Sequence, residues 1–391
     1  MNYDFNTINR NNTNSLKWDL FNDKFPMWVA DMDFKVAPEI SNAILNRANH
    51  KVYGYSIVSD DLYDAYINWW KFYGLKMKKD ELLFAVGVMP AITSIIREFT
   101  SFNDGVLIQT PVYHVFFNVI LNNNRKVIEN PLIYDKDNLS YSIDFKDLEE
   151  KLANPNTKMM LLCNPHNPIG KVWSMEDLIK IGKLCWKYNV ILVSDEIHCD
   201  LTNPGKQYIP FASLDDELSF EEIENSLTCI SPSKTFNIAG LKNSMVFTKN
   251  KEFYSRLNGR LFTDFFSEPN VFSTVATIAA YNDSKDWLEE LKEVLFENKK
   301  IVNNFLTNNI SCIKLVPSDA TYLLWLDCSS LNIDSKSLSE FLRKEKGIFL
   351  SPGIQFGRNG DNFLRMNIAS PKELLNKELM AFKEGIDLLK K

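Results

Sequence analysis

The chain has 391 residues, of which 45% are apolar and 24% charged, and its formal net charge is −6. This length is sufficient for two domains, or for one large α/β unit with a smaller partner. Because the acidity is mild and no long basic block occurs, nucleic-acid binding has little support.

Targeting and cross-linking patterns are also lacking in the sequence. The N-terminus does not show the charged-then-apolar pattern of a signal peptide, and no apolar run reaches the roughly 18–20 residues that a membrane span needs. The six cysteines are scattered without a CxxC pair, so neither a metal site nor a disulfide framework is indicated. We expect a cytoplasmic protein, with no membrane contact and with reduced, mostly buried thiols.

The first hundred residues are predicted to surround one short strand with helices. An apolar stretch over 26–34 either packs on the core as an arm or lines a pocket. A strand that ends at Gly87 and runs into a helix points backbone N–H groups at whatever lies above it, which makes an anion site, although many such turns are only structural. The predicted elements are helices over 38–49, 60–73 and 90–99 and a strand over 82–86.

Strands then alternate with helical stretches, which predicts βαβ units and a mainly parallel sheet. Apolar strand runs occur at 106–109, 159–163, 190–193 and 227–230, and a helix is predicted over 175–188. In such sheets ligands bind beyond the carboxyl ends of the strands. The residues that fall at these predicted ends are Gly87, Tyr113, Asn167, Asp195 and Lys234.

Lys234 and Asp195 are the pair with the most distinctive chemistry. Lys234 closes the stretch 231–234 (Ser-Pro-Ser-Lys), which follows an apolar run and places an amine beside hydroxyl groups that can bind an anion. Pyridoxal phosphate (PLP) forms a Schiff base with a lysine and needs an acid partner for its pyridinium nitrogen. Alone, Lys234 could be an ordinary surface lysine, but with Asp195 it predicts a PLP site.

The C-terminal part is predicted to form a smaller α+β domain, because the alternation fades after a strand over 245–248. We expect an N-terminal arm and part of the small domain over 1–50, a large PLP-binding domain over 51–284 and a C-terminal small domain over 285–391. The elements predicted in the last of these are helices over 287–306, 335–345 and 372–389 and strands over 322–326, 348–350 and 363–367.

Three stretches carry a family resemblance: 164–170 (Asn-Pro-His-Asn-Pro-Ile-Gly), 194–196 (Ser-Asp-Glu) and 231–234. In order and approximate spacing they resemble fold-type I PLP enzymes of the class I/II aminotransferase superfamily. The resemblance covers nearly the whole chain and implies an α/β fold, with a mostly parallel sheet between helices and a smaller α+β domain. Within the superfamily the chain is similar to MalY/PatB-type cystathionine β-lyases, or C–S lyases, in stretches 28–34, 54–56, 170–173, 195–198 and 234–241.

The resemblance implies roles around the cofactor ring. Lys234 would hold PLP and then move the Cα proton of the substrate as general acid and base. Asp195 would keep the ring nitrogen protonated, Asn167 would hydrogen-bond the phenolic oxygen, and Tyr113 would stack on the ring as a further catalytic residue. His198 would lie close to the ring or would be a packed structural histidine.

The resemblance also implies how the phosphate would be held. The backbone amides of Val88 and Met89 would bind it together with Ser231 and Ser233. Two positions depart from the usual pattern. Lys242 stands where many relatives have an arginine, and Val88 stands where many have a small or hydroxyl residue.

Three further expectations concern the substrate and the assembly. Arg365 would bind the substrate α-carboxylate with a planar guanidinium, helped by Asn167 and by the backbone near Ala30. An internal salt bridge is the alternative for Arg365. Tyr55 would reach the phosphate of a neighbouring subunit and serve catalysis there, which requires a homodimer.

The predicted reaction is β-elimination from an amino acid with a sulfur leaving group at Cβ, such as L-cystathionine, to give a thiol, pyruvate and ammonia. An aminotransferase is the alternative, because the same residues serve both reactions. A regulatory binding protein is a third hypothesis. It has less support, because no DNA-binding helix-turn-helix precedes the fold.

Overall fold

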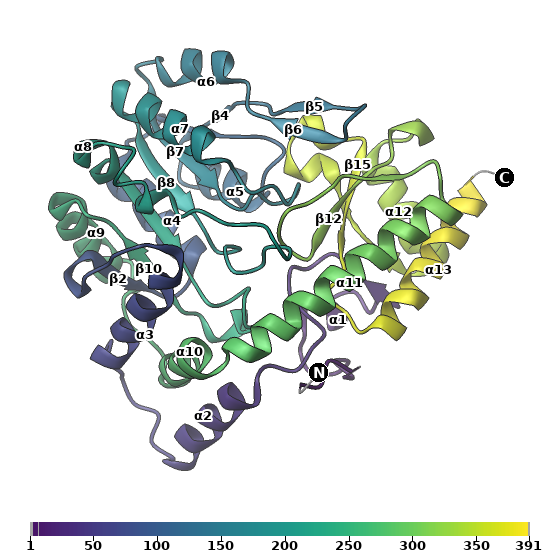
Figure 1. The fold of residues 1–391 in the computed structure, drawn as a ribbon, viewed down its shortest axis with the longest axis horizontal. Coiled ribbons are helices and arrows are strands. Elements are labelled where there is room, and N and C mark those ends of the chain that lie inside the picture. The colour runs from purple at the N-terminus through teal and green to yellow at the C-terminus, as the bar shows by residue number, and fades with distance from the viewer. Residues whose placement is uncertain (1–2, 7, 390–391) are drawn as a thin grey trace.

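A twisted sheet lies at the centre of the computed structural model, which describes residues 3–6 and 8–389 (Figure 1). Within this part of the chain the sheet has seven strands in the order β2-β10-β9-β8-β7-β3-β4, and only β10 runs antiparallel to its neighbours. The strands are β2 (Leu82–Ala85), β3 (Gly105–Ile108), β4 (Lys126–Glu129), β7 (Thr157–Cys163), β8 (Ile191–Asp195), β9 (Ser226–Ile230) and β10 (Ser244–Phe247).

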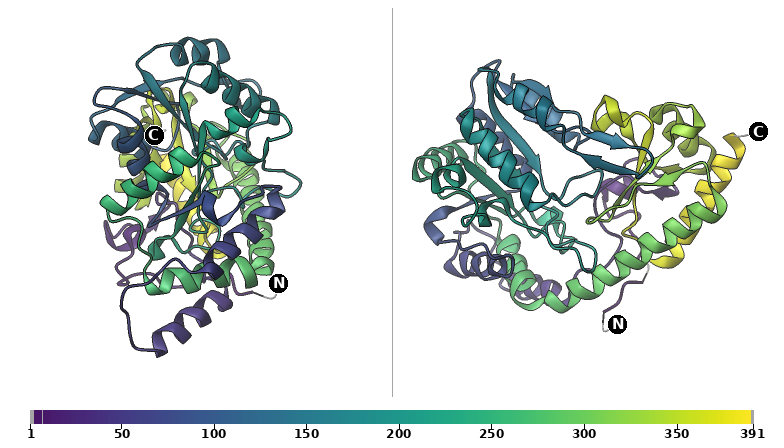
Figure 2. Two further views of the ribbon diagram at one scale, coloured as in Figure 1. Left: turned by 90° about the vertical axis from the view of Figure 1, so that its left-hand side faces the viewer. Right: turned by 45° about the horizontal axis from the view of Figure 1, so that its top comes forward.

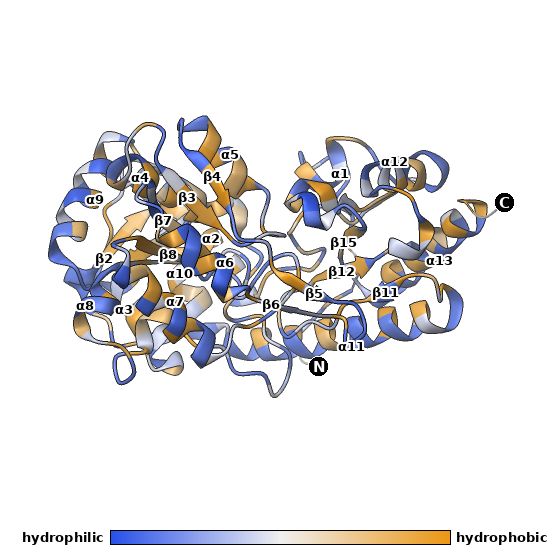
Figure 3. Ribbon diagram, turned by 90° about the horizontal axis from the view of Figure 1, so that it is seen from above, coloured by the Kyte–Doolittle hydropathy of each residue, from blue (hydrophilic) through white to orange (hydrophobic). Residues whose placement is uncertain are grey.

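Helices cover both faces of this sheet, because neighbouring strand residues point to opposite sides. In β7, Met160 and Leu162 pack in a buried cluster with α7, whereas Met159 and Leu161 belong to the cluster of α4, α5 and α9. Apolar strands therefore lie between amphipathic helices (Figure 3). The helices around the sheet are α3 (Asp60–Trp70), α4 (Val88–Phe99), α5 (Val115–Asn122), α6 (Phe145–Leu152), α7 (Met175–Lys187), α8 (Phe220–Glu224), α9 (Lys251–Thr263) and α10 (Val271–Asp283).

A second, antiparallel sheet forms the core of the C-terminal part, with the order β11-β12-β15-β14. The 25-residue helix α11 (Lys285–Asn309) runs from α10 to this sheet, and α12 (Ser335–Lys346) and α13 (Lys372–Leu389) complete the unit (Figure 2). The strands are β11 (Lys314–Leu315), β12 (Leu323–Asp327), β14 (Ser351–Pro352) and β15 (Phe363–Asn367).

The N-terminal segment connects these two parts. It contains α1 (Leu16–Asp19) and β1 (Phe25–Pro26), which pairs with β13 (Ile348–Phe349), and it then crosses to α2 (Pro38–Asn49). Helix α2 packs against α10. The domain boundaries given above stay a prediction.

Most predicted elements occur within two residues of their expected ends, and the differences lie at the edges. Strand β4 was not predicted, because its sequence, Lys-Val-Ile-Glu, is an edge strand without the long apolar run of a buried strand. The hairpin of β5 (Ile133–Asp135) and β6 (Ser140–Ser142) and the helices α6, α9 and α10 were also not predicted. The hairpin and α6 lie between the strong apolar runs used to find the sheet, and α9 and α10 follow the last of them.

Two further features concern membrane-spanning helices and the state of the cysteines. No helix among residues 3–6 and 8–389 is long and apolar enough to cross a membrane. All six cysteines are free thiols, and only Cys312 is partly exposed.

Candidate active site

A cavity opens at the carboxyl ends of the central strands. Loops after β2, β7, β8 and β9 and the N-terminal crossing segment contribute its walls, as expected for a doubly wound sheet. The lining residues are Ala30, Val86, Gly87, Val88, Met89, Tyr113, Cys163, Asn167, Asp195, Ile197, His198, Ser233, Lys234, Ala239 and Lys242.

Asp195 and Lys234 both face this cavity. Asp195 is buried at the end of β8, accepts a hydrogen bond from the Ile197 amide, and has its pKa raised by burial to about 7. Burial also lowers the pKa of Lys234 to about 8. Among the described residues neither side chain forms an ion pair within 4 Å, so both remain available to a ligand.

The start of α4 forms an anion cradle. Gly87, with a φ of 137°, precedes the helix, and no side chain caps its first turn. The Val88 and Met89 amides have no intrahelical acceptor, because the first N–H groups of a helix never do. Ser233 and Lys242 line the same end of the cavity.

Ser231 differs from Ser233 in its surroundings. Its hydroxyl oxygen lies 2.6 Å from the Asn243 carbonyl and 2.7 Å from the Ser233 hydroxyl, and the Ser233 amide donates to it. It does not belong to the residues that line the cavity. Ser233 therefore lines the cavity, and Ser231 lies behind it and supports it through the hydrogen bond between the two hydroxyls.

Arg365 lies buried in β15 without a carboxylate partner in the described chain. Its guanidinium donates to the Asn167 side-chain oxygen at 3.1 Å and to the Trp28 carbonyl at 2.7 Å, while its Nε has no hydrogen-bond partner there. The predicted alternative of an internal salt bridge is therefore wrong. A buried guanidinium with neutral partners and a free donor is suited to bind an incoming carboxylate.

The Ala30 carbonyl contacts the lysine directly, which the sequence did not predict. It accepts from Lys234 Nζ at 2.6 Å and from the Tyr322 hydroxyl at 3.0 Å. Tyr322 itself was missed, because it stands in an apolar strand run where an aromatic residue usually means core. A hydroxyl-bearing ring at the start of β12 was the only available signal.

Of three other predicted residues, two line the cavity and one does not. Tyr113 lines the cavity and follows β3, as expected. His198 also lines it, and burial lowers the pKa of its imidazole to about 3, so this ring is neutral at pH 7. Tyr55 is fully exposed and does not line the cavity of its own chain.

These residues fit PLP. An amine, a buried carboxylate with no protein cation in contact, and a helix N-terminus with free amides surround one cavity. They correspond to the aldehyde carbon, the ring nitrogen and the phosphate of the cofactor.

Comparison with known proteins gives consistent relatives. Residues 28–382 match the family model described as aminotransferase class I and II. Cystathionine beta-lyase PatB of Bacillus subtilis strain 168 is 38% identical over 96% of this chain and 97% of its own. Cystalysin from Treponema denticola, whose structure contains pyridoxal 5'-phosphate, has a TM-score of 0.95 at 34% identity, and both chains are covered in full. A PLP-bound protein from Clostridium difficile 630, provisionally described as an aminotransferase, has a TM-score of 0.94 at 38% identity, with 98% of this chain and 100% of that chain covered.

Proposed function

The chain belongs to the aminotransferase class I and II family, and from this premise we propose that it is a PLP-dependent C–S β-lyase. Its substrates are L-cystathionine or related cysteine S-conjugates. One thioether and one water are converted to a thiol, pyruvate and ammonia. The observation that carries the choice of lyase is the similarity to PatB over nearly the full length of both chains.

Bound PLP supplies an electron sink that makes the Cα proton of an attached amino acid acidic. The Arg365 guanidinium, with the Asn167 amide beside it, holds the α-carboxylate and thereby orients the Cα–H bond. The Lys234 amine, with its lowered pKa, takes that proton and returns it. Asp195 holds the proton on the ring nitrogen, because its buried carboxylate gains a partner there.

The remaining cavity residues position the cofactor. The amides of Val88 and Met89, the Ser233 hydroxyl and the Lys242 ammonium would hold the phosphate at the end of the cavity that they line. Lys242 is a point charge and lacks the fork of an arginine, so the backbone amides carry the directional contacts. Tyr113 covers one face of the ring.

The protein is further proposed to be a homodimer in the cytoplasm. Tyr55 lies on a segment without regular secondary structure in which Val52, Tyr53 and Ile57 are also more than half exposed. Such an apolar surface favours contact with a second copy. Tyr55 would then approach the phosphate in the partner's cavity.

The test is pyruvate release from L-cystathionine by purified, PLP-loaded protein with no 2-oxo acid added. We expect sustained pyruvate with an equal amount of thiol, and none from the Lys234→Ala variant, because its proton carrier is absent. The provisional description of the Clostridium difficile protein favours the alternative, aminotransfer. Conversion of the cofactor to pyridoxamine phosphate without pyruvate, reversed by a 2-oxo acid, would establish that alternative and refute the lyase.

A further inference from the structure

Two stretches far apart in the sequence interlock beside the cavity. One is the bridging segment, defined as residues 28–34, and the other is the turn over residues 232–238 that carries Lys234. The turn is closed by hydrogen bonds from the Ile238 amide to the Ser233 carbonyl and from the Phe236 amide to the Pro232 carbonyl. Lys234 and Asn237 therefore belong to one rigid unit.

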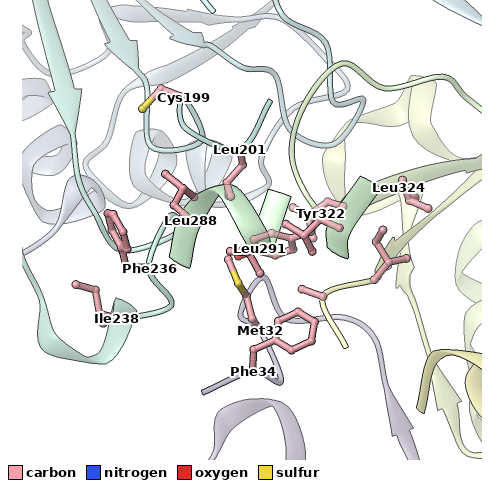
Figure 4. Packing of buried hydrophobic residues seen from close by; sticks show 14 of the residues in the cluster. Met32, Phe34, Cys199, Leu201, Phe236, Ile238, Leu288, Leu291, Tyr322 and Leu324 are labelled. Carbon is pink, nitrogen blue, oxygen red and sulfur yellow. The ribbon is translucent and has the colours of Figure 1, made fainter. Parts of the chain in front are cut away.

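Asn237 joins this turn to the bridging segment through its side-chain amide. Its Oδ1 accepts from the Met32 amide at 3.0 Å, and its Nδ2 donates to the carbonyls of Met32 and Phe34 at 3.0 and 3.1 Å. Its backbone has a φ of 56°, a left-handed conformation that asparagine tolerates. Met32, Phe34, Phe236 and Ile238 all belong to one large buried apolar cluster (Figure 4).

The bridging segment presents one carbonyl to the cavity. Asn367 donates to the carbonyls of Val29 and Asp31, both at 2.6 Å, and so holds the positions on either side of Ala30. The Ala30 carbonyl remains for the Lys234 amine and the Tyr322 hydroxyl. The position of the Ala30 carbonyl relative to Lys234 thus depends on the hydrogen bonds that join the Asn237 side chain to the bridging segment.

We propose that Asn237 is a positioning residue for Lys234: its amide locks the bridging segment to the lysine-bearing turn, so that the Ala30 carbonyl receives the amine whenever that amine is not bonded to the cofactor. A free lysine side chain samples many rotamers and loses this freedom when it is held in one place. A fixed acceptor at 2.6 Å restricts this freedom and directs the amine for its transfer of the Cα proton. The inference rests on the proposed function only in making Lys234 the proton carrier.

The variant that tests it is Asn237→Gly. Glycine adopts positive φ readily, so the turn is retained while the three amide hydrogen bonds are lost. The matched control is Asn189→Gly, an exposed asparagine with a φ of 54° after α7, for whose side chain the described chain shows no hydrogen bond.

The first readout uses PLP-free protein and follows the rate at which added PLP attaches to Lys234 as a function of pH. Attachment needs the neutral amine, so the midpoint reports the lysine pKa. The Ala30 carbonyl stabilises the ammonium, so we expect a lower midpoint in Asn237→Gly and no change in Asn189→Gly. A loss of folding stability alone would not move this midpoint.

The second readout uses PLP-loaded protein and the exchange of the Cα proton of L-alanine with D2O, followed by NMR. Alanine has no leaving group, so exchange reports proton transfer whether or not the protein eliminates thiols. We expect Asn237→Gly to slow exchange by about 10- to 100-fold, as misplacement of a catalytic group does. If the wild-type protein exchanges the Cα proton of L-alanine but releases no pyruvate from L-cystathionine, the lyase function is refuted and this inference is not.

Tyr322→Phe provides an independent test if Asn237→Gly does not fold. The Ala30 oxygen then has a single donor and becomes a stronger acceptor for Lys234, so we expect the attachment midpoint to rise. An unchanged midpoint in Tyr322→Phe, or wild-type midpoint and exchange rate in a folded Asn237→Gly, would overturn the proposal.

Discussion

Asp195 couples function to stability within a single side chain. Its carboxyl is buried and has a pKa raised to about 7, whereas in an unfolded chain it would titrate near pH 4. Between pH 4 and 7 the native state therefore holds a proton that the unfolded state has released. The free energy of unfolding therefore falls as the pH rises through this window, because the native state loses the proton that favoured it.

In the Asp195→Asn variant this fall in the free energy of unfolding should be absent, because an amide does not titrate in this range. We expect the PLP-free variant to exceed the wild type in free energy of unfolding by about 1–4 kcal/mol at pH 8, with the difference vanishing at pH 4. Pyruvate release should fall at least about 100-fold, because an amide cannot hold the ring proton. Urea unfolding at both pH values measures the first effect. An equal difference at pH 4 and pH 8 would contradict it, and Asp137→Asn, on an exposed turn, is the control.

At the scale of elements, buried charges hold the N-terminal segment in place. Lys17 and Asp33 form an ion pair at 2.7 Å with both side chains 2% exposed, and Arg10 and the Trp18 indole also donate to Asp33. Burial by itself would raise the pKa of Asp33, but the neighbouring Lys17 ammonium keeps this pKa below its ordinary value. This network stabilises the bridging segment at the point where it approaches Lys234.

Lys17→Met should therefore be costly. Removing one member of a buried pair leaves an incompletely paired charge, and we expect a loss of about 3 kcal/mol in the free energy of unfolding at pH 7. Lys35→Met is the matched control, because Lys35 pairs with Asp4 at the surface, where solvent screens the pair and its contribution to stability is small. Equal losses in the two variants, measured by urea unfolding, would show that the buried network does not hold the segment.

At the scale of the whole molecule, the position of Tyr55 makes the number of subunits a functional question. We predict that two defective variants complement each other: Lys234→Ala mixed with Tyr55→Ala in one refolded sample. If Tyr55 serves the partner's cavity, half of the dimers are mixed and each has one intact site, which restores about a quarter of wild-type pyruvate release. No recovery above the sum of the separate variants would refute the proposal that Tyr55 serves the partner's cavity.

The sheet and the chemical residues could be predicted from sequence because strong local signals mark both. Apolar runs of four or five residues located the central strands, and the polar residues that follow them include Asp195, Asn167 and Lys234. Strand β4 was missed because an edge strand is half exposed and lacks such a run. The interaction of Tyr322 with Ala30 spans 292 positions, and no local pattern encodes it.

The class of fold and several residues that line the cavity could be predicted from the sequence, because periodicity and residue chemistry are local properties of the chain. How these residues meet depends on the tertiary structure. The tertiary structure brought the bridging segment into contact with both Asn237 and Asn367, and it left Arg365 without a carboxylate partner in the described chain. Such contacts depend on the packing of distant elements, which a pattern in one segment does not contain.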